Sequence, residues 1–280
     1  MKSTESKSSE VAYRTTQTII FDVGGRACTD LTAEAAVRRA NDLGLRHLVL
    51  ASTTGWTARR ALSAAKRLAF QGQVIVIGEH TGYHGRGHQA MPPETRRELE
   101  EAGATVFLGT HALSGPPRSF RLRWGGIDTA EIAAETLRRI SRGTKTCVEV
   151  AIMAADANLI PVDSDVVAIG GGGGGADTAV VIRPANMNTF FDLKVREFIA
   201  LPRFRVAEVL GPVLKPARQG TTRDEIAAEL GISPALVKEY GDLYDRVRAL
   251  RAQGKPLETA LQEAGAHGDV ASTLKELLAP

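Results

Sequence analysis

With 280 residues, 43% of them hydrophobic, and a formal net charge of +3, the chain is typical of a globular protein with one large domain or one domain and an appendage. No apolar run approaches the ~18–20 residues that cross a membrane, and the two cysteines, Cys28 and Cys147, are too few for a disulfide framework and too far apart for a metal-binding knuckle. Because the polar segment 1–16 has no apolar secretory region, we expect a disordered tail there and a cytoplasmic protein.

Strand and helix signals alternate through the middle of the chain. A strand is predicted at Thr18–Val23, and a helix with Thr32 as its N-cap residue is predicted to run to Leu43, before Gly44. The alternation continues with predicted strands at His47–Ala51, Val74–Gly78, Thr105–Leu108 and Thr146–Ile152 and predicted helices at Thr57–Ala69, Pro92–Ala102 and Asp128–Ile140. The last two strands, Val166–Ile169 and Thr178–Ile182, flank a glycine run and predict a hairpin or a tight crossover. This order predicts an α/β fold with a doubly wound, mostly parallel sheet over residues 17–204.

The segment 48–60 combines a buried strand with a phosphate-binding signal. The strand ends in a cluster of hydroxyl residues and one glycine, and a helix-forming run follows. Free backbone N–H groups at a helix N-terminus bind anions, and the helix dipole favours negative charge. Binding residues are therefore predicted at Ser52, Thr53, Thr54, Gly55 and Thr57, and the alternative is an ordinary hydroxyl cap of the following helix.

A second loop of this kind follows the strand Val166–Ile169. Gly170–Gly175 is a run of six glycines, each of which costs conformational entropy, so close approach of a ligand to the backbone is the preferred explanation over a flexible hairpin. The predicted contacts are Gly171, Gly172, Gly173, Gly174, Gly175, Asp177 and Thr178. Two such loops on one sheet indicate a phosphorylated ligand.

Further polar residues follow other predicted strands and are expected at the same edge, because ligands gather at the carboxyl ends of parallel strands. These are His80, Thr81, Gly82, His111 and Ser114, with Asp156 after the predicted strand Thr146–Ile152. His80, His111 and Asp156 are the candidate catalytic residues, with capping of backbone groups as the alternative for each histidine.

Several other side chains have both a structural and a ligand-binding interpretation. His80, His84 and His88 are interleaved with glycines, so the segment is no helix and no metal is predicted. Glu149 in an apolar run needs a partner, for which Arg183 is suggested. Asn186, Asn188 and Phe190 follow the last predicted strand, and Asn188 is included among the ligand contacts. Trp56 is predicted to add a stacking surface for a flat ring.

Residues 205–280 show no strand signal and are predicted to form a helical module. Within it, the spacing of small and apolar residues over 221–251 is typical of a helix-turn-helix. The module carries ten Lys and Arg against eleven Asp and Glu, and an acidic helix face neutralises DNA phosphates poorly. Packing on the α/β domain or joining protomers is therefore preferred over nucleic-acid binding.

Six ordered blocks give residues 17–203 a resemblance to a known family. They read AAVRRANDLGLRHLVLASTTGWTAR (35–59), HTGY (80–83), MPPE (91–94), HALSG (111–115), CVEVAIMAADANLIP (147–161) and GGGGGGADTAVVIRPANMNTFFD (170–192). The chain resembles the C-terminal α/β domain of pyruvate kinase and, more closely, a family of small stand-alone prokaryotic proteins of that fold, several of which bind flavin mononucleotide (FMN). In pyruvate kinase the loops that match Ser52–Thr57 and Gly170–Thr178 line an allosteric sugar-phosphate site, and the resemblance implies no kinase activity.

The chain departs from the family pattern in two loops. It has Cys28-Thr29 where the family commonly has Asn-Thr, and its glycine loop is pure glycine where the family usually carries Ser or Arg between glycines. A pure glycine loop leaves only backbone amides as contacts for a phosphate.

The resemblance and the two loops together predict a homo-oligomeric protein that binds a phosphorylated flavin or nucleotide-type ligand, FMN first among them, at the carboxyl edge of the sheet. The sequence does not indicate a reaction. The alternatives are a ligand-responsive regulator whose helical module contacts DNA or a protein partner, and an allosteric module that acts on a partner protein.

Overall fold

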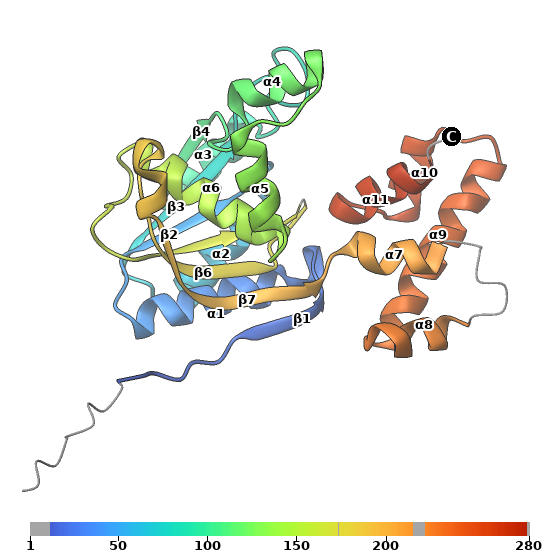
Figure 1. Cartoon of the computed structure of the whole chain (residues 1–280), viewed down its shortest axis with the longest axis horizontal. Coiled ribbons are helices and arrows are strands. Elements are labelled where there is room, and N and C mark those ends of the chain that lie inside the picture. The colour runs from blue at the N-terminus through green and yellow to red at the C-terminus, as the bar shows by residue number, and fades with distance from the viewer. Residues whose placement is uncertain (1–11, 173, 215–221, 279–280) are drawn as a thin grey trace, which may run out of the picture.

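The computed structural model describes residues 12–172, 174–214 and 222–278. A seven-stranded sheet carries the N-terminal two thirds of the chain, and a group of helices follows it (Figure 1). The strands are β1 (Ile19–Val23), β2 (His47–Ala51), β3 (Gln73–Glu79), β4 (Ala104–Gly109), β5 (Val166–Gly170), β6 (Thr178–Arg183) and β7 (Lys194–Phe204). The helices before β7 are α1 (Thr29–Asp42), α2 (Trp56–Arg67), α3 (Pro93–Glu101), α4 (Gly115–Trp124), α5 (Thr129–Arg138) and α6 (Arg142–Asp156), with short 3-10 segments η1 (Arg26–Cys28) and η2 (Met187–Asp192).

The strand order is β1-β7-β6-β5-β2-β3-β4. In the part of the chain that the structure describes, β6 runs antiparallel to both of its neighbours and the other six strands run parallel to one another. The predicted mostly parallel α/β sheet is therefore confirmed, and β5 and β6 form the hairpin that was one of the two predicted arrangements.

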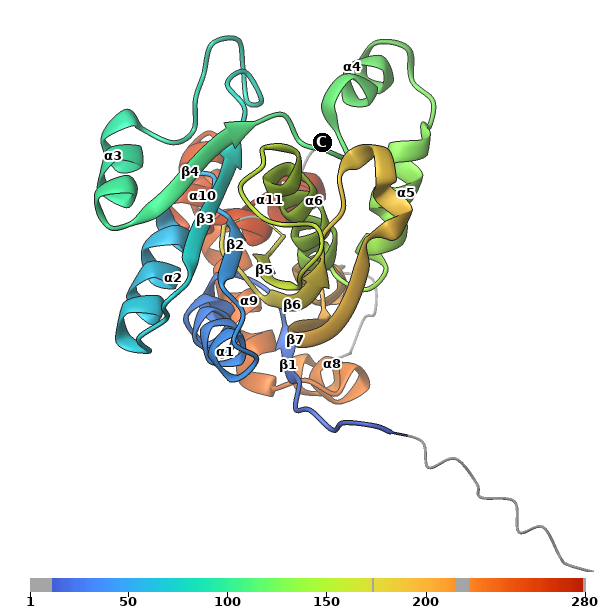
Figure 2. The same cartoon turned by 90° about the vertical axis from the view of Figure 1, so that its left-hand side faces the viewer.

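Helices cover both faces of the sheet (Figure 2). One face packs against α1, α2 and α3 through small residues, chiefly the alanines of α1 and α2, which let the helices approach the strands closely. The other face packs against α6, which α5 covers in turn. Because both faces are covered, the central strands are apolar along their whole length, as in β5, where every residue is buried.

The predicted strand Thr146–Ile152 is wrong, because these residues lie in the middle of α6. Val148, Val150 and Ile152 alternate with other residues and so imitate a strand pattern. In the structure, every residue from Cys147 to Ala155 is buried, because α6 lies between the sheet and α5. A helix whose apolar residues are not confined to one face is typical of such a position. Cys147 is buried, as expected, although on a helix.

Two elements near the end of the sheet were not predicted. β7 lies between β6 and β1 in the sheet, although its charged residues and Pro202 gave no strand signal. Because β6 runs against the other strands, the chain leaves it at the amino edge of the sheet, where η2 follows. The other unpredicted element, α4, has no buried residue.

Beyond β7 the described residues form helices α7 (Val206–Leu214), α8 (Arg223–Leu230), α9 (Pro234–Ala252), α10 (Leu257–Ala264) and α11 (Gly268–Leu278). α8 begins with a capping box between Thr222 and Glu225, and Gly231 ends it in the left-handed conformation before α9. These helices share a hydrophobic core of their own, to which Val23 and Phe204 of the sheet contribute. The proposed domain boundaries stay predictions. Residues 1–11 of the predicted disordered tail lie outside the described residues.

Ser141 generates the first testable prediction. Its hydroxyl oxygen accepts a hydrogen bond from the amide of Thr144 at 2.8 Å, which caps α6, and lies 3.0 Å from the hydroxyl of Thr178 on β6. Ser141→Ala leaves both partners buried without this bond, so we expect the free energy of unfolding to fall by about 1–3 kcal/mol. Urea unfolding measures it. Ser63→Ala on the exposed face of α2 is the control, and an equal loss in both variants would contradict the capping role.

Candidate functional site

A cleft of about 630 Å³ opens where the carboxyl ends of the central strands meet the helices α4, α5, α6 and α11. Ser52, Thr53, Thr54 and Thr57 line it after β2, and the glycine loop lines it after β5. These two loops are neighbours because β2 and β5 pair in parallel, with Leu50 opposite Ile169. The volume lies in the range of sites that hold a small organic ligand.

The loop after β2 presents backbone amides and hydroxyls to the cleft. Gly55 takes a left-handed conformation (φ 84°) before α2 and supplies no side-chain cap. The buried hydroxyl of Ser52 accepts a hydrogen bond from the Ala58 amide at 3.3 Å, which leaves the first two amides of the helix, those of Trp56 and Thr57, for a ligand. Thr54 is exposed in the cleft. The geometry is that of an anion site at a helix N-terminus.

The segment after β1 contacts the glycine loop and fixes its position. The hydroxyl of Thr29 accepts a hydrogen bond from the amide of Ala176 at 2.9 Å. A Cβ atom at Gly175 would lie 2.6 Å from Cα of Arg26, and one at Gly171 would collide with the carbonyl oxygen of Gly175. At these positions the backbone of the chain itself therefore requires glycine, which is a structural reason beside the predicted approach of a ligand. Gly173 lies outside the described residues.

Positive charge predominates among the side chains that line the cleft. Six cationic side chains, Arg26, Arg118, Arg121, Arg138, Arg142 and Lys145, face three carboxylates, those of Glu79, Glu131 and Glu149. Ion pairs join Glu131 to Arg121 and Arg138, while the guanidinium of Arg118 lies 4.5 Å from the ring centre of Tyr83. A cleft with this excess of positive charge attracts an anionic ligand.

Lys145 and Glu149 form a buried ion pair at the α6 wall of the cleft. The two residues stand four apart on α6, with Nζ of Lys145 2.5 Å from Oε2 of Glu149. The other carboxylate oxygen accepts the amide of Leu113 at 3.1 Å, so Glu149 also anchors the loop after β4. Burial lowers the pKa of the Lys145 ammonium, although the Glu149 carboxylate opposes that shift. A lysine of this kind is suited to hold or transfer a proton.

His111 lies beside this pair, within a group of aromatic rings. Its ring centre is 4.7 Å from that of Tyr83 and 5.7 Å from that of His80. Burial lowers the pKa of His111, which favours the neutral imidazole. Nδ1 of both histidines is buried and finds no hydrogen-bond partner among the described residues. A buried polar atom without a partner is a position where a ligand group would be favoured.

With this geometry, the family can be assigned. The family model described as pyruvate kinase, alpha/beta domain, matches residues 30–182, more than half of the chain. The chain belongs to this family. The match runs from α1 into β6, so both anion-type loops lie in the pyruvate kinase alpha/beta domain, whereas β1, β7 and the helices after β7 lie beyond the match.

The structure brings together most of the residues that were predicted to bind a ligand in the pyruvate kinase alpha/beta domain. The cleft is lined by Ser52, Thr53, Thr54, Thr57, His111, Ser114, Gly171, Gly172, Gly174 and Gly175. The predicted residues outside its lining are Gly55, His80, Thr81, Gly82, Asp177, Thr178 and Asn188. A Cβ atom at Gly55 would collide with Thr95 on α3, so this glycine serves the turn and the packing of α3. Asp177 and Thr178 are buried beneath the loop.

Three placements predicted from the sequence are wrong. Asp156 ends α6 rather than a strand, and its carboxylate accepts hydrogen bonds from the Asn186 side chain and the Met187 amide, which excludes it from the carboxyl edge. Asn188 lies in η2, at the amino edge, because β6 is reversed. Arg183 binds Asp165 at 2.6 Å, while Lys145 is the partner of Glu149.

Trp56 differs from its expected role. The guanidinium carbons of Arg26 and Arg60 lie 4.0 and 3.6 Å from the Trp56 ring centre, so cations already occupy the surface that was predicted to stack on a ligand. Cys28 is buried, and burial raises its pKa to about 12. Among the described residues no group of three His, Cys, Asp or Glu side chains has a geometry that could hold a metal ion.

Sequence reasoning missed the cationic lining and the buried pair. Lys145 and Glu149 were not paired because the strand interpretation places residues four apart on the same face but too distant to touch, whereas a helix brings them together. Arg138, on α5, also lines the cleft. No local signal indicated that Gly268 and Ser272 of α11 reach it.

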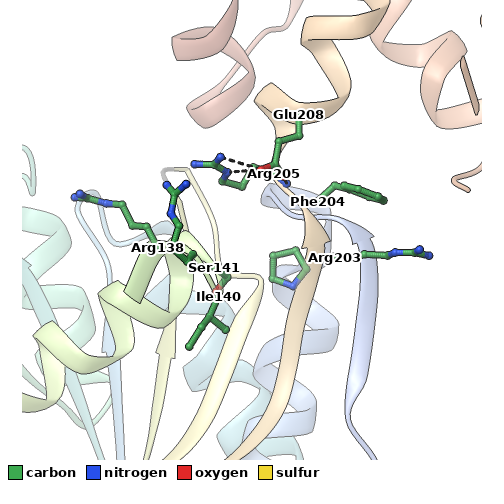
Figure 3. A pocket seen from close by; sticks show the side chains of 9 residues that line it. Arg138, Ile140, Ser141, Arg203, Phe204, Arg205 and Glu208 are labelled. Atoms are coloured by element: carbon green, nitrogen blue, oxygen red, sulfur yellow. Dashed lines mark hydrogen bonds and ion pairs between the residues drawn. The ribbon is translucent and has the colours of Figure 1, made fainter. Parts of the chain in front are cut away.

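A second hollow, of about 90 Å³, lies where β7 passes into α7 (Figure 3). It is rich in arginine, but Arg203 points away from the others and Arg205 is bound to Glu208 at 2.8 Å. Arg138 and Arg139 both contact Glu135. Its volume and these pairs indicate a structural junction. No described helix has the length and apolar character needed to cross a membrane.

The buried pair gives the second prediction. Lys145→Met leaves the Glu149 carboxylate buried without its cation, so we expect the free energy of unfolding to fall by about 3–5 kcal/mol in urea titrations at pH 7. Adding Glu149→Gln removes the unpaired charge while an amide oxygen still accepts from Leu113. The double variant is therefore expected to be more stable than the single one, and a double variant that is no more stable would contradict this account.

Proposed function

We propose that the cleft binds a phosphorylated flavin or nucleotide-type ligand, and that this ligand is FMN. The observation that carries the proposal is the convergence of two amide-rich loops and six cationic side chains on one cleft of about 630 Å³. An anionic group and a sizeable organic body are both suited to such a site.

The phosphate end of the ligand would lie between the two loops. The amides of Trp56 and Thr57, the hydroxyl of Thr54 and the amides of the glycine loop supply donors there, and Arg26 adds positive charge. Because the glycine loop carries no side chains, its contribution would come from backbone N–H groups alone. The helix dipole of α2 favours the same charge.

The flat end of the ligand would lie against the wall that His111, Tyr83 and Met153 line. The fit of a flavin there is supported by the aromatic rings and by the unpartnered Nδ1 of His111, because an isoalloxazine ring has an apolar face and a polar edge. Trp56 is left out of this surface, since Arg26 and Arg60 occupy it. The residues present therefore fit the group.

A bound flavin would supply redox chemistry. The chain's own contribution is distinct: Arg118 and the α6 wall would orient the ligand, and Lys145 would hold or move a proton at Nζ, with Glu149 as its partner. We propose binding and assign no reaction, because the described residues that line the cleft offer no nucleophile with an adjacent base beyond this pair.

The proposal is tested at Thr54, which is exposed in the cleft at the N-terminus of α2. Thr54→Asp places a carboxylate against the phosphate and is expected to abolish FMN binding. Thr54→Ala removes at most one hydrogen bond to a charged group, so a loss of roughly 10- to 150-fold in affinity is expected. Calorimetric titration of FMN and riboflavin into the wild type and both variants measures this.

Two comparisons complete the test. Ser63→Asp adds the same charge to the exposed face of the same helix and is expected to leave FMN affinity within about twofold, since exposed charges are screened at this distance. Riboflavin is expected to bind poorly throughout. Equal affinity of the wild type for FMN and riboflavin would refute a phosphate site and leave the loop as a helix cap.

A ligand-responsive regulatory protein is the second candidate. It is favoured by one observation, the contribution of Gly268 and Ser272 from the C-terminal helices to the lining of the cleft. In the described residues, Arg223 of α8 binds Asp242 and Asp245 of α9, so these charges are satisfied within the helical region. We propose a protein surface rather than DNA as the target of this region, and a homo-oligomer stays the proposed assembly.

A further inference from the structure

One wall of the cleft comes from outside the family domain. Gly268 and Ser272 belong to α11, which lies more than eighty residues beyond the matched range 30–182. They face the cleft together with the glycine loop after β5. A ligand in the cleft would therefore be enclosed by the pyruvate kinase alpha/beta domain and by a helix that this domain does not contain.

The contact between the two walls is backbone against backbone. A Cβ atom at Gly174 would lie 2.8 Å from Cα of Gly268, closer than side chains approach backbone atoms, and 3.3 Å from its nitrogen. Gly174 has φ 89° and Gly268 has φ 55°. The glycine loop and the start of α11 thus approach closely at a pair of glycines, so a side chain at position 174 would push α11 away.

The helices after β7 form a packing unit with a hydrophobic core separate from those of the sheet. Their core is formed by α7 to α11, and the two cores of the α/β domain are separate from it. Val23 and Phe204, at the carboxyl ends of β1 and β7, are the sheet residues of that core, and α7 follows β7 directly. A body with its own core, joined at one edge, is the arrangement in which hinge movements occur.

We propose that α11 is a movable wall of the ligand cleft, so that a phosphorylated ligand bound there holds the C-terminal helices against the glycine loop. The inference rests on the proposed function and adds its regulation. Ligand binding and the position of α11 are then coupled, and linkage requires the coupling to act in both directions. A change that displaces α11 must weaken ligand binding, and bound ligand must protect the α11 amides from hydrogen exchange.

The first arm measures protection in the full-length protein. Hydrogen exchange of the wild type, followed by mass spectrometry of peptides, is compared with and without saturating FMN. We expect exchange of the α11 amides to slow at least threefold with FMN, whereas α3, which lies outside the cleft lining, stays unchanged. Calorimetry on the same sample shows separately whether FMN binds.

The second arm uses two glycines with nearly the same positive φ. Gly174→Ala and Gly103→Ala both place a side chain at φ near 90°, but only position 174 faces α11, and position 103 has no atom within 4 Å of the added Cβ. We expect Gly174→Ala to raise the hydrogen-exchange rate of the α11 amides and to lower the affinity for FMN about tenfold. Gly103→Ala is expected to change neither quantity, although both variants place an alanine at a positive φ and are strained there.

The third arm acts from α11 itself and does not alter the glycine loop. Ser272→Asp adds a carboxylate to the cleft wall, whereas Gln262→Glu adds the same charge to the exposed face of α10. Ser272→Asp is expected to lower the affinity for FMN at least fivefold, because the carboxylate repels the phosphate, and to leave the affinity for riboflavin unchanged. Gln262→Glu is expected to change neither affinity.

The outcomes separate the two claims. FMN binding with unchanged α11 exchange and an unchanged affinity of Ser272→Asp would overturn the movable wall and leave the proposed function standing. Absence of FMN binding to the wild type would overturn the proposed function, and this inference with it. Protection of α11 together with a loss of affinity in Gly174→Ala and Ser272→Asp, but in neither control, supports the proposal.

Discussion

The parallel pairing of β2 with β5 is the constraint on which the site depends. Leu48, Val49 and Leu50 lie opposite Val167, Ala168 and Ile169, and all six are buried between helices on both faces of the sheet. A slip of one residue would turn each of these side chains to the other face, so the register is strongly specified. The two strands consequently end together, and the loops that follow them, which begin at Ser52 and Gly171, become the two sides of one cleft.

The glycine loop shows how packing and binding can require the same residue type. Gly171 and Gly175 are fixed by contacts with the chain's own backbone, and Thr29 holds the loop from below. Gly174 is different, because the atoms that exclude a side chain there belong to α11. Glycine is thus required at positions 171 and 175 by the packing of the loop itself and the segment after β1, and at position 174 by the contact with α11. Its entropic cost is offset by contacts that no larger residue allows.

Charge in the cleft is arranged in two groups with different environments. The arginines of α4, α5 and η1 lie at its rim and are partly exposed, so they attract an anion from solution but are screened by salt. Lys145 is buried beside Glu149 and is shielded from that screening. The rim is suited to capture and orientation of an anionic ligand, while the buried pair is suited to a group that must keep a defined protonation state.

Local signals in the sequence determined much of the α/β domain. The apolar strands, the turn glycines and the hydroxyl cluster Ser52–Thr57 act within a few residues of one another, so β1 to β6 and the loop before α2 were predicted with their approximate bounds. The family was also recognisable, because its blocks stand in fixed order and 30–182 matches its model. The predicted anion-binding loops meet at one cleft, although what binds there stays a prediction.

Only the tertiary structure decided which residues complete the site. Val148, Val150 and Ile152 alternate like a strand, but they lie on the buried helix α6, and the helix brings Lys145 and Glu149 together and removes Asp156 from the edge. The β5–β6 hairpin, which the sequence left open beside a crossover, reverses β6 and so places Asn188 at the opposite edge. The approach of Gly268 to Gly174 joins residues 94 positions apart. Such contacts depend on how separate elements pack, and periodicity within one element carries no information about its partners.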